Sequence, residues 1–372
     1  MADDRTHPRP PRPPRPPGPP GARTQRGVAK LGVTKLGVAE RRRAQDLLGE
    51  VVMGRYVIEA ELGAGAMGTV YRGRHVRLPR NVAIKVLHED YATHPTMLAR
   101  FRREAEAAGR LRHPNVSGVL DVGETADGHP LMVMDLVEGA SLRAILDGGP
   151  GETLADAGDT LDAADTLVTG LGRPRIINFV RQLLAGLDHA HAAGLVHRDL
   201  KPDNVIVEIA PHGGEVPRIV DFGIAALRTD EAPGTSRLTE TGVLLGTPLY
   251  MAPEQARGDE VDHRADLFAL GIMMFEMLAG TMPFDGSSIE VVVANMNEDL
   301  PAIADRAPHV ACDRVLELFM RRLAARDPAH RFASARDALA MLDHIERDPE
   351  DAAVRLGQTD IARAIAVVWL PH

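Results

Sequence analysis

The sequence predicts a two-lobed α+β protein, in which an antiparallel β lobe with one main helix precedes a mostly helical lobe. From Tyr56 onward, short β-branched runs alternate with glycine and proline, which is typical of an antiparallel sheet. Beyond Gly139, apolar residues recur at helical spacing through most of the chain. Strands followed by helices, in 372 residues of which 44% are hydrophobic and 26% charged, indicate a globular protein with two packed parts. The seam between the lobes is the natural place for a ligand.

The first lobe is expected to contain five strands and one helix. Three strand-like runs come first, and a charged helix over 96–112 follows, closed by Pro114. Two further strand-like runs complete the lobe. The five runs are YVIEAEL, TVYRGRHV, NVAIKVL, VSGVLDVGE and PLMVMDLV.

The second lobe is expected to be built around long helices. Apolar residues recur every three or four positions in three segments, which predicts a buried face on each. The segments read IINFVRQLLAGLDHAHAAG, DLFALGIMMFEMLAG and RVLELFMRRLAA. Before the first of them, residues 147–174 are rich in glycine and acidic residues, and we expect a surface excursion there.

The two ends of the chain differ from its body in amino-acid composition. Residues 1–50 form an arm rich in proline and arginine, predicted to be disordered, whose run PRPPRPPRPPGPP is expected to be an extended polyproline helix. This arm is either a stiff spacer or a ligand for an adaptor with an SH3-like or WW-like groove. The body spans 51–346, with lobes over 51–138 and 139–346. A tail over 347–372 ends in the apolar run IARAIAVVWLPH, which needs a partner surface on the helical lobe or on another chain.

Composition excludes several classes of protein. Cys312 is the single cysteine, so neither an intrachain disulfide nor a cysteine zinc site is available. No apolar run is long enough to span a membrane, and the N-terminus lacks the apolar core of a signal peptide, so we expect a cytoplasmic protein. The net charge is −9, with a basic arm on an acidic body. An acidic body argues against nucleic-acid binding.

A glycine motif lies between the first two expected strands. Gly63, Gly65 and Gly68 are followed by Val70 in a G-x-G-x-x-G-x-V pattern. The same glycine spacing opens dinucleotide-binding folds, but there a helix follows the glycines, and here another strand does. A glycine-rich hairpin lets backbone N–H groups approach phosphate oxygens without a clash with Cβ atoms.

A lysine ends the third expected strand. Lys85 closes the run Val-Ala-Ile-Lys, and a lysine there is costly to bury unless it is paired. A phosphate and a carboxylate would provide that pairing. Glu104 on the following helix is the expected carboxylate, and Glu106, which faces a different side of the helix, is its competitor.

The densest polar cluster is the run HRDLKPDN at 197–204. Asp199 and Asn204 lie within it, and Asp221 follows in the sequence Asp-Phe-Gly. Hard oxygen ligands of this kind suit Mg²⁺, which binds through few carboxylates together with substrate phosphates. Three histidines nearby also suggest a metal, but helix and packing positions explain them better; they are His189, His191 and His197.

The run GTPLYMAPE follows at 246–254. Together these motifs occur in the same order as in the protein kinases, which the chain therefore resembles. The closest resemblance is to bacterial members of the eukaryotic-like (Hanks-type) serine/threonine family, and it covers about residues 54–345. It implies the two-lobed protein-kinase fold, with ATP and Mg²⁺ as cofactors.

The resemblance also implies roles for individual residues. Lys85 would contact the α- and β-phosphates of ATP and pair with Glu104. Asp199 would accept the proton of the substrate hydroxyl, and Lys201 would steady the transferred phosphoryl group. The Mg²⁺ ligands would be Asn204 and Asp221. The remaining nucleotide contacts would come from Leu62, Gly63, Gly65, Gly68, Val70, Ala83, the gatekeeper Met134, the hinge Asp135, Leu136 and Val137 through backbone groups, and Ile206.

Three threonines and two structural pairs complete the resemblance. Thr247 before a proline, and the run Leu-Lys-Pro-Asp-Asn after Asp199, resemble the serine/threonine kinases. Thr239 and Thr241 resemble an activating phosphorylation pair, whose phosphate would meet Arg198. Two structural pairings are expected as well: Glu254 with Arg331, and Asp266 with the backbone of the catalytic loop.

The resulting hypothesis is a protein kinase that transfers the ATP γ-phosphate to serine and threonine hydroxyls of proteins after autophosphorylation of its activation loop. The main alternative is a pseudokinase or scaffold that binds nucleotide without transfer, and the presence of Lys85, Asp199, Asn204 and Asp221 argues against it. A small-molecule phosphotransferase of the same fold is a second alternative. A homodimer and an adaptor role for the arm remain open.

Overall fold

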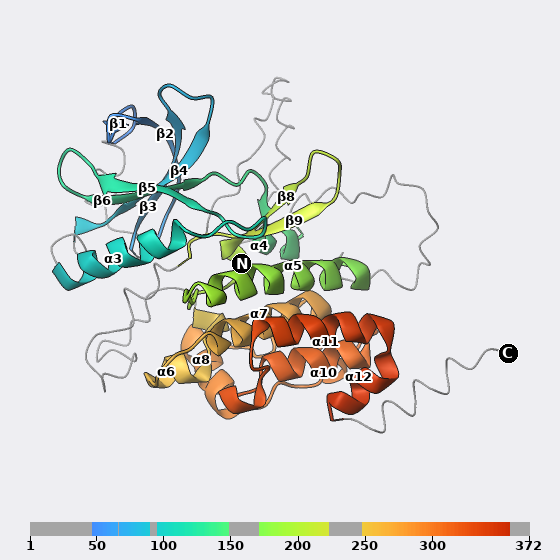
Figure 1. Cartoon of the computed structure of the whole chain (residues 1–372). Helices are drawn as coiled ribbons and strands as arrows, with labels where there is room; N and C mark the ends of the chain where they lie inside the picture. Colours follow the sequence, from blue (N-terminus) through green and yellow to red (C-terminus); the bar gives the residue numbers. More distant parts are fainter. Residues whose placement is uncertain (1–46, 66, 90–94, 149–170, 223–247, 358–372) are drawn as a thin grey trace, which may run out of the picture.

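The computed structural model describes residues 47–357 except for residues 66, 90–94, 149–170 and 223–247 (Figure 1). A β-sheet with one helix forms the upper lobe in Figure 1, and a stack of helices forms the lower lobe. The expected two-lobed α+β architecture is confirmed. Most of the arm over 1–50 and the apolar end of the tail lie outside the described residues.

The N-terminal lobe is built on a six-stranded antiparallel sheet in the order β1-β2-β3-β4-β6-β5. Helix α3 (Pro95–Ala108) packs on the face of this sheet that is turned toward the C-terminal lobe (Figure 1). It ends a few residues before the end of the helix predicted over 96–112. The strands are β1 (Val51–Val52), β2 (Tyr56–Ala64), β3 (Gly68–His75), β4 (Asn81–Leu87), β5 (Val119–Glu124) and β6 (Pro130–Asp135).

The pleat of β4 divides its side chains between two hydrophobic cores. Val82 and Ile84 join a small core on the outer face of the sheet, while Ala83 and Leu87 join the main core, which α3 and the helices below share. Side chains alternate along a strand, so Lys85 lies on the same face as Ala83. The alternation therefore aims Lys85 at the seam between the lobes.

The C-terminal lobe surrounds one helix that is buried on all sides. Every residue of α7 (Arg264–Ala279) from Ala265 onward is buried, which explains why the segment is apolar around its whole circumference. Around it lie α4 (Leu142–Leu146), α5 (Arg173–Ala192), α6 (Pro253–Arg257), α8 (Ser288–Asn297), α9 (Ile303–Arg306), α10 (Arg314–Leu323), α11 (Ala335–Arg347) and α12 (Pro349–Arg355), with the short helical turns η1 (Pro202–Asn204), η3 (Pro248–Tyr250) and η4 (Pro328–His330).

Helix α12 falls within the segment 347–372 that the sequence predicts to be a tail. Ala352 and Ala353 on this helix are fully buried in the main core. The first part of this segment therefore packs on the C-terminal lobe as far as Leu356.

A three-stranded sheet lies at the seam, in the order β7 (Ala140–Ser141), β8 (Val205–Ile209), β9 (Glu215–Ile219). The stretch before β5 pairs with the end of β9: Ser117 N donates to Ile219 O and Ile219 N donates to Asn115 O, each at 2.9 Å. The buried Asn115 amide also donates to Pro217 O at 2.9 Å. These bonds connect the N-terminal lobe to the sheet that carries part of the site.

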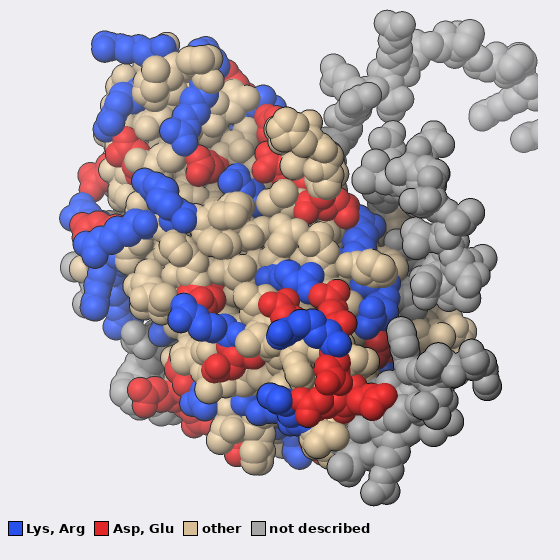
Figure 2. Space-filling model, turned by 45° about the vertical axis from the view of Figure 1, so that its right-hand side comes forward, with Lys and Arg blue, Asp and Glu red and all other residues tan. Residues whose placement is uncertain are grey.

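Basic and acidic side chains are interspersed on the face shown in Figure 2, where no continuous basic stripe is visible. Such a pattern differs from the clustered basic surface of a nucleic-acid-binding face. In the part of the chain that the structure describes, no helix has the length and apolar character needed to cross a membrane.

Candidate active site

The glycine motif forms the hairpin between β2 and β3. Gly65 N donates to Gly68 O at 2.9 Å, which closes the turn. A Cβ atom on Gly68 would lie 2.2 Å from Val86 O, so β3 and β4 approach each other more closely than any side chain at this position would allow. A Cβ atom on Gly65 would lie 3.7 Å from Gly68 O, an ordinary van der Waals contact. Strand packing thus requires glycine at position 68, whereas position 65 has room for a side-chain carbon.

Lys85 is buried beneath this hairpin and bridges the two lobes. Its Nζ atom donates to Asp221 Oδ2 at 2.9 Å, across 136 positions of sequence. Burial by itself would raise the pKa of Asp221, but the charge and hydrogen bond of Lys85 outweigh that effect and hold the pKa below its ordinary value. Asp221 is therefore a carboxylate, held at the seam by a cation from the other lobe.

Glu104, the expected partner of Lys85 on helix α3, and its competitor Glu106 differ in exposure to solvent. Glu104 is half-buried, whereas Glu106 is exposed to solvent. Of the two carboxylates, Glu104 is thus on the inner side of α3. An ion pair between Glu104 and Lys85 stays a prediction.

The loop that carries Asp199 is held from below by a buried carboxylate. Asp266 on α7 accepts from the backbone N–H groups of His197 and Arg198, each at 2.8 Å. His191 Nε2 donates to the same carboxylate at 2.8 Å. Burial would raise the pKa of Asp266, but its hydrogen bond with His191 and the nearby histidines lower it below the ordinary range. The expected bond between Asp266 and the catalytic-loop backbone is confirmed, whereas the participation of His191 was not expected.

His197 occupies the centre of this loop as a packing and bonding residue. Its Nε2–H donates to Val220 O at 2.9 Å, while Nδ1 accepts from Asp199 N at 3.3 Å, so the two bonds fix the neutral tautomer. Its ring meets Phe222 edge-on, with ring centroids 4.9 Å apart. His197 therefore ties the segment around Asp199 to the segment around Asp221. Among the described residues, no group of three His, Cys, Asp or Glu side chains is arranged to hold a metal ion.

Two residues of the site have a left-handed backbone. The φ angles of Arg198 and Asp221 are both +64°, a region that residues other than glycine seldom adopt. Such conformations cost about 1–3 kcal/mol each and persist where the surrounding structure imposes them. Here the bond of Arg198 N to Asp266 holds the first residue, and the bond of Lys85 to Asp221 holds the second.

Asp199, Lys201 and Asn204 are brought together in the loop and the turn that follows it. Lys201 Nζ donates to Asp199 Oδ2 at 2.8 Å, and the Asn204 amide donates to Asp199 O at 2.8 Å. Val220 N donates to Asn204 O at 2.9 Å. Because Val220 directly precedes Asp221, this bond brings Asn204 close to Asp221. The Asp199 side chain is 37% exposed, so it remains accessible to a reactant in solution.

The donor set fits Mg²⁺. An ionised carboxylate on Asp221 and the amide oxygen of Asn204 are hard oxygen ligands, and Mg²⁺ is usually held by one or two protein ligands while phosphates and water fill the remaining positions. The residues present therefore suit a metal that arrives together with a phosphate ligand.

The predicted adenine-side residues line both sides of the seam. Ala83 and Met134 are paired across β4 and β6, and both are buried. Val70 packs on the main core from β3, and the half-buried Ile206 lies on β8 in the opposite lobe. Leu62 is half-buried on β2, as is Val137 after β6.

Asp135 begins the segment that connects the lobes. Its carboxylate pairs with Arg80 at 2.7 Å, and its backbone N–H donates to Gly118 O at 3.0 Å. The Asp135 side chain is thus paired with Arg80, and the backbone contacts of this segment with a nucleotide stay a prediction.

A second buried network, which the sequence analysis missed, lies beside the catalytic loop. Arg143 on α4 donates to both carboxylate oxygens of Glu276 on α7, at 2.7 and 2.8 Å. Tyr250 of η3 donates to Glu276 Oε2 at 2.6 Å and also contacts Arg143. Burial and the adjacent Glu276 carboxylate raise the pKa of the Tyr250 hydroxyl. The signal available in the sequence was Glu276 in the otherwise apolar run Leu267–Leu278, because a buried carboxylate needs a partner.

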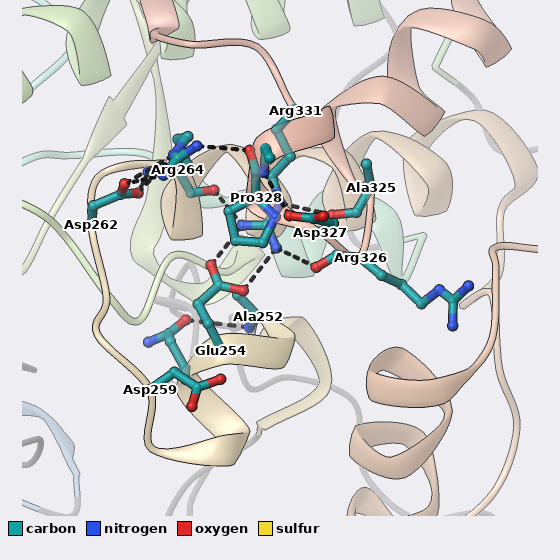
Figure 3. A network of polar contacts seen from close by, with 12 residues as sticks. Ala252, Glu254, Asp259, Asp262, Arg264, Ala325, Arg326, Asp327, Pro328 and Arg331 are labelled. Carbon is teal, nitrogen blue, oxygen red and sulfur yellow. Dashed lines mark hydrogen bonds and ion pairs between the residues drawn. The ribbon is translucent and has the colours of Figure 1, made fainter. Parts of the chain in front are cut away.

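The expected pair between Glu254 and Arg331 is confirmed, and Figure 3 shows its surroundings. Arg331 also donates to the carbonyl groups of Arg264, Ala325 and Arg326. One guanidinium therefore joins α6, the start of α7 and the stretch before η4. This junction holds the chain segment that leads from η3 into α6.

Three predicted residues lie outside the described part of the chain: Thr239, Thr241 and Thr247.

Comparison with known proteins agrees with this geometry. The family model described as "Protein kinase domain" matches residues 56–344. The chain is 35% identical over 304 residues to serine/threonine-protein kinase pkn3 of Myxococcus xanthus, covering 82% of this chain and 52% of the relative. It is 36% identical over 311 residues to serine/threonine-protein kinase PknL of Mycobacterium tuberculosis, covering 81% of this chain and 67% of the relative.

A solved structure shows the same fold. The crystal structure of the Mycobacterium tuberculosis PknI kinase domain matches with a TM-score of 0.57 and 30% identity, covering 80% of this chain and 98% of that domain. The chain spans about half the length of pkn3 and 40% of serine/threonine-protein kinase PrkC of Bacillus subtilis. The similarity thus concerns the part of these relatives that matches the kinase model.

Proposed function

The chain belongs to the protein kinase family, and we propose that it is a serine/threonine protein kinase that transfers the γ-phosphate of ATP to protein hydroxyl groups. The observation that carries this proposal is the convergence of Lys85 from the N-terminal lobe with Asp199, Asn204 and Asp221 from the C-terminal lobe. Relatives named as serine/threonine kinases support the choice of hydroxyl.

Positioning and charge neutralisation provide most of the catalysis in this arrangement. Lys85 would bind the phosphates of ATP from above while its Nζ keeps Asp221 in place. Asn204 and Asp221 would hold Mg²⁺, which when bound neutralises charge on the phosphates. Asp199, accessible at the end of its loop, would orient the attacking hydroxyl and accept its proton, a contribution of about 10²–10⁴-fold.

Lys201 is placed to act on the same group that Asp199 orients. Its Nζ lies 2.8 Å from Asp199 Oδ2, so one ammonium group can contact both the carboxylate and a phosphoryl oxygen beside it. The preference for serine and threonine over tyrosine as the phosphorylated residue rests on the predicted contact of Thr247 with Asp199. This contact belongs to the serine/threonine kinase pattern.

We further propose activation by autophosphorylation at Thr239 and Thr241. Arg198 supports this proposal, because its backbone is fixed by Asp266 directly beside Asp199. A phosphothreonine adds about −1.5 to −2 charges and three acceptor oxygens, which an arginine at this position can bind. A cytoplasmic location, a homodimer and an adaptor for the arm remain sequence-based predictions.

The decisive experiment is autophosphorylation with labelled ATP and Mg²⁺, comparing the natural chain with Asp199→Asn, followed by mapping of the labelled residues. We expect labelling that disappears in the variant and maps to Thr239 or Thr241. Binding of Mg-ATP, measured by calorimetry, should survive in Asp199→Asn, which separates loss of chemistry from loss of fold. Binding without labelling in either protein would contradict transfer activity and favour a nucleotide-binding scaffold.

The activation step is tested separately by the double variant Thr239→Ala/Thr241→Ala. Reduced phosphorylation of an added protein substrate, restored by acidic replacements, would support it. Unchanged turnover in the double variant would overturn the activation proposal and leave the kinase proposal intact.

A further inference from the structure

His88, the first residue after β4, contacts the glycine hairpin between β2 and β3 through both its backbone and its ring. His88 N donates to Met67 O at 3.0 Å, which continues the pairing of β3 with β4 beyond Gly68 and Leu87. The ring nitrogen Nε2 lies 3.1 Å from Gly65 O. Because a carbonyl oxygen can only accept a hydrogen bond, Nε2–H is the donor. His88 therefore holds the hairpin at two points.

The two points differ in what else secures them. Met67 and Gly68 are buried, and Met67 belongs to the main hydrophobic core together with Leu87. Gly65, in contrast, is exposed to solvent. Core packing and strand pairing therefore secure the hairpin at Met67 and Gly68, whereas the restraint at Gly65 comes from hydrogen bonds.

Both backbone polar groups of Gly65 are hydrogen-bonded. Its N–H group donates to Gly68 O at 2.9 Å, and its carbonyl oxygen accepts from His88. Glycine has more accessible backbone conformations than any other residue, and this hairpin contains three glycines in six positions. The two bonds therefore restrict a part of the chain that would otherwise sample many conformations. A side chain outside the glycine motif supplies one of them.

The orientation of the Gly65 carbonyl group matters for a ligand that carries phosphates. Backbone N–H groups attract an anion, whereas a carbonyl oxygen carries partial negative charge and repels it. While His88 binds this oxygen, the oxygen is directed at the imidazole ring and is not free to turn toward a phosphate. The neutral imidazole already carries the N–H group that the bond needs, so the contact does not require a protonated ring.

We propose that His88 is a positioning residue for the phosphates of ATP, and that it acts by holding the carbonyl group of Gly65. The inference rests on the proposed kinase function, because it concerns the same nucleotide site. A loop that is already held in its binding conformation loses less conformational freedom when the ligand binds, and this raises the affinity. In this role His88 strengthens ATP binding without touching the nucleotide.

Calorimetric titration of the full chain with Mg-ATP, and separately with adenosine, tests this role. His88→Ala should weaken Mg-ATP binding by about two- to tenfold, which corresponds to the loss of one hydrogen bond. The same variant should bind adenosine like the natural chain, because adenosine carries no phosphate. His88→Gln should restore most of the Mg-ATP affinity, because the glutamine side-chain amide can donate from a position close to that of Nε2.

His75→Ala is the matched control in the same lobe. The His75 ring accepts from Arg77 N and Leu78 N, each at 3.1 Å, so it stabilises the connection between β3 and β4 and not the glycine hairpin. This variant should bind both ligands like the natural chain. Thermal unfolding verifies that each variant is folded.

Three outcomes would overturn the positioning role and leave the kinase proposal intact. In the first, Mg-ATP binds His88→Ala and the natural chain equally well. In the second, the substitution weakens Mg-ATP and adenosine binding by the same factor, which would assign the ring a role in stability alone. In the third, His88→Gln binds Mg-ATP as weakly as His88→Ala, which would favour a direct contact of the imidazole with a phosphate. A natural chain that binds no Mg-ATP would instead overturn the proposed function, and this inference with it.

Discussion

The carboxylate of Glu254 and the guanidinium of Arg331 form a two-point ion pair, with Oε1–Nη1 and Oε2–Nη2 distances of 2.6 and 2.8 Å. Both side chains are buried, although 77 positions separate them. The Arg331 guanidinium also lies 5.0 Å from the centre of the Phe268 ring on α7. A bidentate pair with further bonds to backbone carbonyls is the geometry in which a buried charge is well satisfied.

Arg331→Ala should lower the free energy of unfolding by about 3–5 kcal/mol, because it leaves the Glu254 carboxylate buried without its counter-ion. Urea unfolding measures this loss. Arg336→Ala is the matched control, since Arg336 pairs with Asp188 at the surface with its side chain 75% exposed, and its loss should cost about 1 kcal/mol or less. Equal costs in the two variants would contradict the importance of burial.

Gly68→Ala should destabilise the N-terminal lobe by about 1–3 kcal/mol or more, because the new Cβ atom would lie 2.2 Å from Val86 O. Gly65→Ala adds the same methyl group at an ordinary contact distance of 3.7 Å from Gly68 O and should change stability by about 0.5 kcal/mol or less. Thermal unfolding of the two variants side by side tests the difference. The idea fails if Gly65→Ala is the more damaging of the two.

Asp266→Asn should reduce kcat by about tenfold or more while the KM for ATP changes little. An amide cannot accept the bonds from His191, His197 N and Arg198 N as a carboxylate does, so the loop that carries Asp199 loses its fixed position. Steady-state kinetics on a protein substrate measure both constants. Asp262→Asn, which removes an exposed carboxylate beside Arg264, should leave both constants close to their natural values.

The lowered pKa of Asp266 also predicts how stability depends on pH. The unfolded chain binds a proton at this carboxyl at higher pH than the folded chain, so Asp266 stabilises the fold above its unfolded pKa of about 3.9. This contribution is lost as the pH falls through the lower folded value. The difference in unfolding free energy between the natural chain and Asp266→Asn should thus be largest near neutral pH and shrink in acid. A difference that grows as the pH falls would show that the sign is wrong.

Glu104→Gln should lower kcat/KM for ATP-dependent transfer by on the order of tenfold, and Glu106→Gln should not. Glu104 is on the inner side of α3 and Glu106 is exposed, so only Glu104 is placed for the predicted ion pair with Lys85. Kinetics of both variants test this assignment. Equal activity in the Glu104 variant and the natural chain would exclude the pairing of Lys85 with Glu104.

The sequence by itself determined the two-lobed architecture and the order of the predicted catalytic and binding motifs along the chain. Short β-branched runs and long apolar periodicities are local signals, and motifs such as Val-Ala-Ile-Lys and His-Arg-Asp occupy adjacent positions that can be read without a fold. The pairings of Glu254 with Arg331 and of Asp266 with the catalytic loop were also predicted, because the resemblance to the protein kinases implies them.

Only the tertiary structure decided which distant groups meet. The bond between Lys85 and Asp221 spans 136 positions and both lobes, and the contact of Arg143 with Glu276 spans 133. Burial of α12 on the main core likewise depends on how whole helices pack. Local propensity is set by a residue and its near neighbours, whereas a buried ion pair is set by the relative placement of elements, which arises only when the hydrophobic core assembles.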